Sequence, residues 1–353
     1  MSKEIIPEGN PIGKWLLPEG PRSEIVISSR IRLARNIKGI PFLTRAEKRE
    51  KEKVLEMVKE ALEKKGLLKE GHFLREKELS PLKLNFLKER HLIPSDFAHS
   101  RLERGIYVKS DETESILVNE EDHLRLQSLT SGMDLYTAYQ KIEKLDNLLA
   151  EVIPFAFSPE LGFLTACPTN VGTGMRASFF IHLPGLVITK EMEKVLRSLL
   201  ELGFTVRGIY GEGTETKGNL FQISNQITLG LSEEEILEKV TKIGEQILDY
   251  EMKAREFLLK NFRAALEDKI FRSYAILKNS RLLNSEEATN LLLLVRLGIN
   301  LNLIKDVDLK KINTLLILTR PANLQIYYNQ EMDEKERDEK RAALVRLYLG
   351  NGQ

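Results

Sequence analysis

The stretch Cys167-Pro168-Thr169-Asn170-Val171-Gly172-Thr173-Gly174-Met175-Arg176 places the only cysteine of the chain beside a glycine-rich loop, and Arg176 opens an apolar run typical of a strand. Glycines let backbone NH groups approach an anion closely, threonine adds a hydroxyl, and arginine adds a charged fork that matches phosphate oxygens. The loop therefore indicates chemistry on a phosphate. The alternative is a turn beside a buried cysteine, because free cysteines usually behave as small apolar residues.

The composition is that of an ordinary globular protein. The 353 residues, 42% of them hydrophobic, are enough for two or three domains. Lys and Arg total 53 against 52 for Asp and Glu, so no global field draws the chain to nucleic acid, and an anion site must be local. One cysteine excludes an internal disulfide. Without a signal peptide or a long apolar run, we expect a cytoplasmic location and no membrane contact.

The periodicity of the first 230 residues predicts an α+β fold. Prolines and glycines indicate an extended arm over residues 1–22, and alternation over 24–30 indicates a strand. Thr44 and Glu47 form a capping-box pattern ahead of a helix that ends at Gly66. Further strands are predicted at 105–109, 115–118, 161–166, 176–183 and 204–210, with helices at 135–152 and 190–202. Strands in succession favour a largely antiparallel sheet flanked by helices.

The pattern changes at Ser232, which forms a second capping-box pattern with Glu235. From there to the end the chain is almost wholly helical in pattern and rich in leucine. We therefore expect three parts: the arm over 1–22, an α+β domain over 23–255, and an all-helical C-terminal domain over 256–353.

Three more segments carry charge next to expected strands. In Ser28-Ser29-Arg30-Ile31-Arg32, the two arginines share one face if the strand continues, so their guanidinium groups converge; the alternative is a solvated basic face. Asn119-Glu120-Glu121-Asp122-His123-Leu124-Arg125 follows an apolar run. Its carboxylates suit indirect Mg²⁺ binding, orientation of a cation or proton transfer, and the alternative is an acidic turn in which His123 is an ordinary hydrogen-bonding partner.

The last segment is Arg207-Gly208-Ile209-Tyr210-Gly211-Glu212-Gly213-Thr214-Glu215, which leads on to Gln222-Ile223-Ser224-Asn225. Alone it is an ordinary hairpin. Taken in order, however, the four segments resemble the motifs of the phosphagen (guanidino) kinase family over roughly residues 20–232. The resemblance implies the family's phosphagen kinase and glutamine synthetase-like catalytic fold, ATP and Mg²⁺ as cofactors, and phosphoryl transfer to a guanidinium nitrogen.

The resemblance also implies which residues bind ATP. Five arginines match those that clamp the nucleotide phosphates, and Phe180 stands where small-molecule members commonly have a histidine near the adenine. Because phosphoryl transfer depends mostly on positioning and on neutralising charge, such a clamp makes chemical sense. The implied ATP-binding residues are Ser29, Arg30, Arg32, Arg125, Arg176, Phe180, Arg207 and Asn225.

The implied catalytic residues are Glu121, Asp122, Cys167 and Glu212. Glu121 matches the glutamate that pairs with the guanidinium and accepts its proton, and Glu212 matches a second carboxylate that grips the acceptor. Cys167 matches the reactive cysteine of the family, expected as a thiolate whose pKa is lowered by nearby positive charge rather than as a covalent nucleophile. No direct protein ligand to the metal is expected, because Mg²⁺ is held through ATP phosphates and water.

The ends of the chain indicate which guanidinium accepts the phosphate. Small-metabolite members carry about a hundred residues before the Ser-Ser-Arg strand, whereas 27 residues precede Ser28 here, and the extra length is C-terminal. With Trp15 and Gly20-Pro21, this arrangement resembles the bacterial protein arginine kinases. The implied acceptor is an arginine of a protein, and alternatives are a kinase for free arginine or another guanidino metabolite, and a non-catalytic adaptor that binds phosphoarginine.

The resemblance assigns further roles to the C-terminal domain, namely dimerisation and recognition of phosphoarginine by Arg337 and Asp338. The alternative for this charged run is a solvated helix with ion pairs between successive turns. Implied partners are protein substrates with exposed arginines, a heat-shock repressor (CtsR-like), an activator protein (McsA-like) and a Clp ATPase complex, in stress response and the tagging of proteins for proteolysis.

Overall fold

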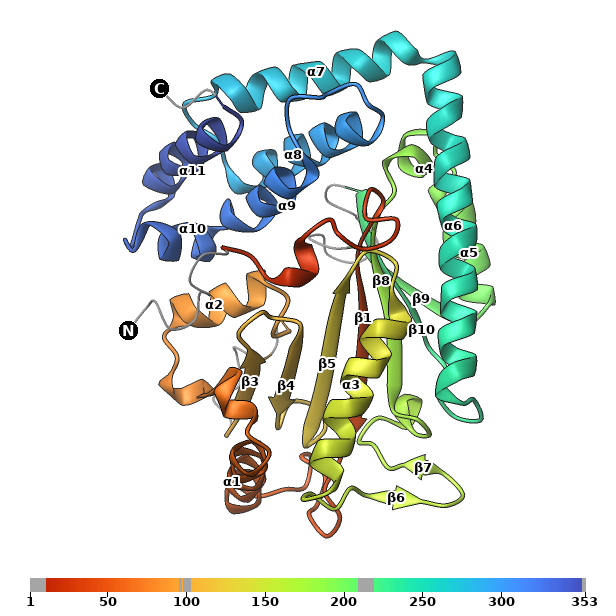
Figure 1. Ribbon diagram of the computed structural model, residues 1–353, viewed down its shortest axis with the longest axis vertical. Helices are drawn as coiled ribbons and strands as arrows, with labels where there is room; N and C mark the ends of the chain where they lie inside the picture. Colours follow the sequence, from red (N-terminus) through yellow and green to blue (C-terminus); the bar gives the residue numbers. More distant parts are fainter. Residues whose placement is uncertain (1–10, 95–96, 98–102, 209–218, 351–353) are drawn as a thin grey trace.

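A computed structural model describes residues 11–94, 97, 103–208 and 219–350. Within them, eight strands form one sheet in the order β2-β3-β4-β5-β1-β8-β10-β9 (Figure 1). Every neighbouring pair is antiparallel, as predicted. The strands are β1 (Val26–Arg35), β2 (Gly71–Arg75), β3 (Gly105–Lys109), β4 (Glu114–Val118), β5 (Leu124–Ser131), β8 (Met175–His182), β9 (Phe204–Gly208) and β10 (Leu220–Asn225).

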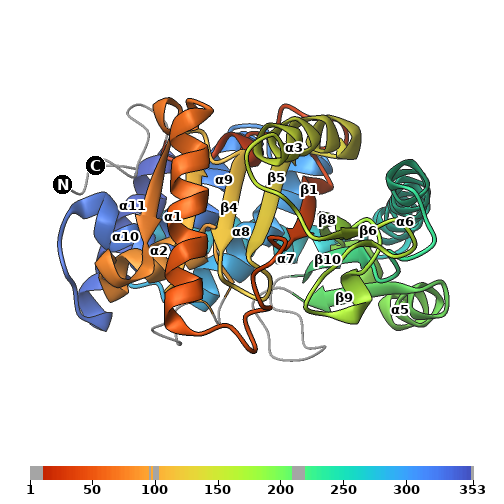
Figure 2. The same cartoon turned by 90° about the horizontal axis from the view of Figure 1, so that it is seen from below.

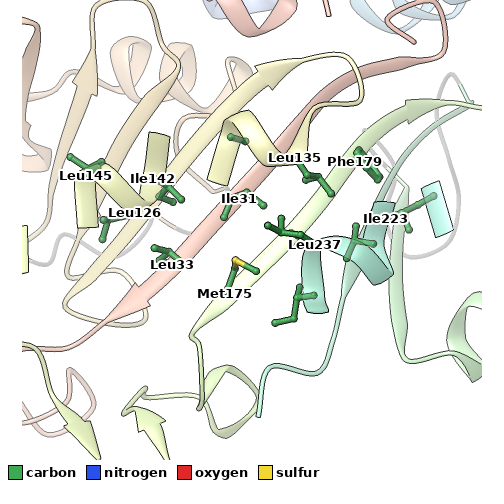
Figure 3. Close-up of a cluster of buried hydrophobic side chains, with 14 of the residues drawn as sticks. Ile31, Leu33, Leu126, Leu135, Ile142, Leu145, Met175, Phe179, Ile223 and Leu237 are labelled. Atoms are coloured by element: carbon green, nitrogen blue, oxygen red, sulfur yellow. The ribbon is translucent and has the colours of Figure 1, made fainter. Parts of the chain in front are cut away.

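Helices cover one face of this sheet. Helix α3 (Leu135–Ala150) lies beside β1 and β5, and α6 (Glu233–Asn261) lies beside β8 and β10 (Figure 2). In Figure 3, Ile31, Leu126, Met175 and other strand residues point toward side chains of α3 and α6. Gly244 lets α6 approach closely, because a Cβ there would lie 2.5 Å from the Phe179 ring. The same core includes residues of α1 (Lys48–Lys64) and α5 (Met192–Glu201).

Two local predictions were wrong. Helix α1 begins at Lys48 and not after Thr44, because Glu47 is its N-cap and forms the capping box with Glu50. The predicted strand over 161–166 is reduced to β7 (Gly162–Phe163), which pairs with β6 (Phe157–Ser158). The rest of that segment is held in a loop, where the Asp122 carboxylate accepts from the backbone NH of Ala166. The capping box of Ser232 and Glu235 at the start of α6 is confirmed.

The C-terminal third is helical, as predicted. Its helices are α7 (Arg263–Asn279), α8 (Ser285–Asn300), α9 (Leu309–Leu318), α10 (Pro321–Tyr328) and α11 (Glu334–Tyr348). They lie at one end of the sheet (Figure 1). Helix α6 runs unbroken to Asn261, across the expected boundary at residue 255. No helix in the described part of the chain combines the length and apolar character needed to cross a bilayer.

The N-terminal arm packs against both the sheet and the C-terminal helices. Residues 11–25 lie between the C-terminal helices and the sheet (Figure 1), and their short 3-10 helix η2 (Lys14–Leu16) is mostly buried. Trp15 and Leu16 share a hydrophobic cluster with α7, α8, α9 and α11 and also with Ile27 and Leu129 of the sheet. This cluster is separate from the core under α3 and α6. Two short helices, α2 (Pro81–Glu89) and α4 (Pro184–Ile188), complete the fold.

Candidate active site

Strand β1 separates apolar from charged side chains. Ile31 and Leu33 belong to the core beneath α3 and α6. Because successive side chains of a strand point to opposite faces, Arg30 and Arg32 both lie on the face away from those helices. The expectation that these two arginines share a face is confirmed.

Strand pairing brings further arginines to the same face. Directly paired residues of neighbouring antiparallel strands lie on one face, and Arg32 pairs with Arg176 while Arg125 pairs with Ala34, two residues along β1. Arg207 pairs with Gln222, which pairs in turn with Phe180 on β8. The structure therefore places five arginines, from four strands, on one face: Arg30, Arg32, Arg125, Arg176 and Arg207.

These guanidinium groups are close enough to disturb one another. Burial, together with the positive charges of Arg125, Arg176 and Arg207, lowers the pKa of Arg30 to about 9. The pKa of Arg32 is lowered further by burial and by all four other arginines. The buried Nε of Arg32 has no hydrogen-bond partner within the described residues. Concentrated, partly desolvated positive charge is unfavourable until an anion neutralises it, so this face suits a polyphosphate.

The loop between β4 and β5 carries the acidic motif. Glu120 forms an ion pair with Arg125, whose Nη1 lies 2.6 Å from the Glu120 carboxylate. Glu121 is exposed, and partial desolvation and the negative charges of Asp122 and Glu120 raise its pKa, against the effect of Arg125 and Arg32. A carboxylate with a raised pKa beside a cationic site is suited to accept a proton or to pair with a guanidinium.

Asp122 and His123 have other roles. Both are buried, and Asp122 Oδ1 accepts from Asn36 Nδ2 (2.5 Å) and from the backbone NH of Ala166 (2.6 Å). His123 Nδ1 accepts from the backbone NH of Ile37, while Nε2 lies 2.9 Å from the carbonyl oxygen of Pro41. Through these bonds Asp122 anchors the segment before Cys167, and its catalytic role stays a prediction. His123 is an ordinary hydrogen-bonding partner, as the alternative interpretation held.

The loop of Cys167 is held from several sides. The half-buried Cys167 precedes the short 3-10 helix η6 (Pro168–Asn170), and its Sγ lies 3.0 Å from Thr169 Oγ1. Thr228 Oγ1 donates to the carbonyls of Thr169 (2.9 Å) and Val171 (2.7 Å). Glu121 and Cys167 both lie close enough to Arg176 to interact with its charge. The thiol and the motif glutamate therefore both lie near Arg176, on the same part of the arginine face.

A cavity of about 260 Å³ opens at this end of the sheet. Asn225 borders it, but its amide is used inside the fold: Oδ1 accepts from the NH of Ala177 and Nδ2 donates to the carbonyl of Met175. Arg176 is oriented by Ser224, whose Oγ accepts from its Nε at 3.1 Å. The cavity is lined by Thr169, Asn170, Arg176, Thr205, Arg207, Asn225, Gln226 and Thr228.

The side chain of Ser29 lies on the opposite face of β1 from Arg30 and Arg32, and its role in ATP binding stays a prediction. It alternates with Arg30 and so lies on the helix-covered face, where it is fully buried. Its hydroxyl donates to the carbonyl of Gly132 (2.7 Å) and accepts from the NH of Asp134 (2.8 Å), which caps α3. Phe180 does lie on the arginine face, where its ring is 5.7 Å from the ring of His91.

Three other predicted residues lie apart from this face or outside the described residues. Glu212 falls within 209–218, which the structure does not describe. Arg337 and Asp338 lie on α11, where Arg337 Nη1 donates to the carbonyl of Met332 (2.8 Å) and Asp338 Oδ1 accepts from Arg341 (2.5 Å). They form a separate charged group in the helical third of the chain.

Sequence reasoning missed two residues that shape the site. Asn36 bridges the acidic motif, because its side chain donates to Asp122 and accepts from the backbone NH of His123. Glu120 is the motif carboxylate that pairs with Arg125. The only sequence feature that pointed to Asn36 was its position next to the arginine-rich strand. The run of Glu120, Glu121 and Asp122 did not by itself show which glutamate would pair with Arg125.

Comparison with known proteins identifies both parts of the chain. Residues 53–254 match the model of the ATP:guanido phosphotransferase C-terminal catalytic domain, and residues 263–353 match the protein-arginine kinase McsB C-terminal domain. The chain is 45% identical to the protein-arginine kinase of Moorella thermoacetica over 95% of its own length and 97% of that protein. It is 44% identical to that of Bacillus cereus strain G9842, with 96% of each chain covered.

Solved structures agree with this assignment. A crystal structure of lombricine kinase superposes with a TM-score of 0.58 at 26% identity, covering 68% of this chain and 70% of that one. The duplicated taurocyamine kinase of Schistosoma mansoni, solved with bound transition-state analogue components, gives a TM-score of 0.60 at 25% identity. It covers 72% of this chain and 37% of the duplicated protein.

Proposed function

Because this chain belongs to the protein-arginine kinases of the ATP:guanido phosphotransferase family, we infer that it transfers the γ-phosphoryl group of ATP to arginine side chains of proteins. The observation that carries this function is the face of five arginines that ends at Glu121 and Cys167. One end suits a polyphosphate, and the other suits a cationic acceptor. The 260 Å³ cavity is lined by Arg176 and Arg207 and by Thr169 and Asn170, which follow Cys167 in the chain.

We propose that Arg30, Arg32, Arg125, Arg176 and Arg207 bind the phosphates of ATP. Their mutual repulsion supports this role, because a bound polyphosphate replaces it with attraction. In phosphoryl transfer the charge of the transition state is spread over the phosphoryl oxygens, so fixed cations stabilise it. Phe180 would stack on the base, and Asn225 would hold β8 and β10 in register beneath the nucleotide.

We propose that Glu121 pairs with the acceptor guanidinium and takes its proton. An arginine guanidinium keeps its proton at neutral pH, so an adjacent carboxylate is needed as transfer begins. The raised pKa of Glu121 supports this role. Cys167 would contact the acceptor from the other side, and Glu212 would be a second carboxylate. Asp122 would act as a positioning residue, through its hydrogen bond to the backbone of Ala166.

We propose that Mg²⁺ arrives bound to ATP. Among the described residues, no group of three or more His, Cys, Asp or Glu side chains has the arrangement of a metal site. Mg²⁺ commonly uses one or two carboxylates, several waters and substrate phosphates, so this residue set fits a metal held mainly by the nucleotide. Glu120 and Glu121 would contact its waters. The ion would help to neutralise the phosphate oxygens that the arginines leave free.

For the helical third of the chain, we propose a domain over 256–353 that follows the catalytic domain over 23–255 and binds phosphoarginine through Arg337 and Asp338. The ion pair of Asp338 with the buried Arg341 supports this role, because it holds the carboxylate in one orientation. Arg337 would contact the phosphate, and Asp338 the guanidinium. The domain would also mediate homodimerisation.

Family membership supports a wider proposal about partners. We propose that the enzyme is cytoplasmic and modifies a CtsR-like heat-shock repressor and other proteins with exposed arginines. An McsA-like activator and a Clp ATPase complex would be its other partners in stress response and proteolysis. Co-purification of these proteins with the enzyme, before and after heat shock, tests each partner separately.

The function is tested with a purified arginine-rich protein and Mg-ATP. Mass spectrometry at neutral pH should find acid-labile phosphate on arginine, and Glu121→Gln should lower its formation by about a hundredfold or more, as expected for loss of a general base. Glu60→Gln, which removes an exposed carboxylate from α1, should have no effect. Phosphate only on Ser, Thr or Tyr, or efficient turnover of free arginine with none on protein, would reject the proposed function.

A further inference from the structure

A fully buried arginine of the C-terminal helices reaches into the catalytic half of the molecule. Arg296 lies on α8, and its Nη2 and Nη1 donate to the carbonyls of Ser23 (2.6 Å) and Glu24 (2.9 Å). Nη1 also lies 3.3 Å from His182 Nδ1, and Nε donates to Asn313 Oδ1 at 3.3 Å. One guanidinium therefore contacts three separate segments of the chain, at Ser23-Glu24, His182 and Asn313.

The groups that Arg296 contacts lie at the ends of two neighbouring strands of the sheet. Ser23 and Glu24 lie just before β1, separated from it by Ile25, and β1 carries Arg30 and Arg32. His182 is the last residue of β8, which carries Arg176. These neighbouring strands thus share one buried anchor at the end of the sheet where the C-terminal helices pack (Figure 1).

The same helices also hold the arm. Asn313 of α9 donates to the carbonyl of Leu16 at 2.8 Å. At the other end of the arm, Arg90 donates to the carbonyl of Pro11 and, at 3.2 Å, to Asn323 Oδ1 of α10. The arm is therefore linked to the C-terminal helices on both sides of Trp15, directly by Asn313 at Leu16 and indirectly, through Arg90 and Asn323, at Pro11.

Trp15, which lies between these two links, is also in contact with the surroundings of the arginine face. Its buried side chain lines a cavity of about 30 Å³ together with Arg30, His91 and Phe180. Phe180 also packs against the hydrophobic cluster formed by the arm and the C-terminal helices. A displacement of these helices would therefore move the surroundings of Arg30 as well as the start of β1.

We propose that Arg296 is a positioning residue for phosphoryl transfer: through it, the C-terminal helices set the placement of the β1 and β8 arginines and hence the affinity for ATP. The inference rests on the proposed function, because it assigns those arginines to ATP. Its physical basis is that removing the guanidinium takes the side-chain donor from the part-buried carbonyl of Ser23 and leaves the carbonyl of Glu24 with Asn300 alone, so the strand ends shift toward new partners. Remote shifts of about 1 Å can cost on the order of a hundredfold in rate.

The test compares Arg296→Met with the wild-type enzyme. Methionine keeps an apolar stem but no donor. We expect the KM for ATP and the Kd for Mg-ADP, measured by calorimetry, to rise about tenfold or more, while the KM for the protein acceptor stays within about twofold. A variant that merely folded less completely would lose kcat with unchanged KM and Kd. Arg296→Lys, which keeps one donor group, should recover part of the ATP affinity.

Two neighbouring residues of α9 provide a second test of the proposal together with its control. Asn313 and Thr314 are adjacent and buried, but Asn313 bonds to Leu16 and Arg296, whereas the Thr314 hydroxyl bonds to a carbonyl of its own helix. Asn313→Ala should raise the Kd for Mg-ADP, and Thr314→Ala should not. This pair decides the question if Arg296→Met does not fold.

The inference would be overturned if folded Arg296→Met or Asn313→Ala kept the wild-type KM and Kd and showed only a lower melting temperature. The contacts of Arg296 would then stabilise the fold without affecting ATP binding. An equal effect of Asn313→Ala and Thr314→Ala would overturn it as well. A wild-type enzyme that binds Mg-ADP but transfers no phosphate to arginine would reject the proposed function separately, because the calorimetric comparison does not depend on the acceptor.

Discussion

At the residue scale, Glu121 and Asp122 are neighbours with different surroundings. Asp122 is buried and accepts two hydrogen bonds, whereas Glu121 is exposed beside the arginine face. Desolvation and the adjacent carboxylates raise the pKa of Glu121. As the proposed base it works only when ionised, so activity should fall as the pH drops through a value above the usual 4.3 or so of a glutamate.

Glu120→Gln should move this acidic limb of the kcat/KM profile to lower pH. The substitution removes a negative charge that raises the pKa of Glu121 and frees Arg125, which lowers it. The pH-rate profile of the variant, compared with the wild type and with Glu60→Gln, measures the shift. A limb that stays in place or moves to higher pH would show that Glu121 is not the group that titrates.

Asp122→Ala tests the anchoring of the cysteine loop. The substitution removes the acceptor of the backbone NH of Ala166 and one of the two acceptors of the Asn36 amide, at a cost of about 1–3 kcal/mol in the free energy of unfolding. Urea denaturation should show this loss, and kcat should fall because Cys167 lies next to Ala166. Asp249→Ala, at an exposed position of α6, is the control. Equal stability of the two variants would contradict the anchoring role.

At the element scale, α6 depends on its N-terminal cap. Ser232 and Glu235 satisfy each other's backbone NH groups, and the first turns of the helix place Ile236 and Leu237 in the core beneath the sheet. Ser232→Ala should therefore lower the free energy of unfolding by about 1 kcal/mol. Ser198→Ala on α5, whose hydroxyl bonds within its own helix, should change it much less. A neutral effect of Ser232→Ala in urea denaturation would show that packing alone holds this helix end.

The elements also show the limits of local patterns. Strands β3, β4, β8 and β9 and helices α3 and α5 lie close to their predicted positions, because each has a clear run of apolar residues or a clear helical period. Strand β5 was not predicted, although it carries Arg125. Its alternation of apolar and polar residues covers only Leu124 to Gln127 and breaks at Ser128, and Gln127, Ser128 and Thr130 are polar residues that are nevertheless buried.

At the scale of the whole molecule, one hydrophobic cluster joins the arm, the sheet and the C-terminal helices. Trp15 is the only tryptophan and lies inside this cluster. We therefore expect the C-terminal helices and the sheet to unfold together, so that Trp15 fluorescence and far-UV circular dichroism give the same urea midpoint. An earlier transition in fluorescence would show that the C-terminal helices and the arm separate before the sheet unfolds.

The sequence by itself determined the four motifs, their order and the alternation that puts Arg30 and Arg32 on one face of a strand. These properties are local, since a strand of period two needs only its own residues. The tertiary structure decided which polar side chains remain available. It buried Ser29 and Asp122 in hydrogen bonds with distant backbone groups, left Glu121 exposed, and joined Arg296 to Glu24, 272 residues away. Such partners exist only after the chain has folded, because hydrogen bonding of a buried group depends on whatever segment packs against it.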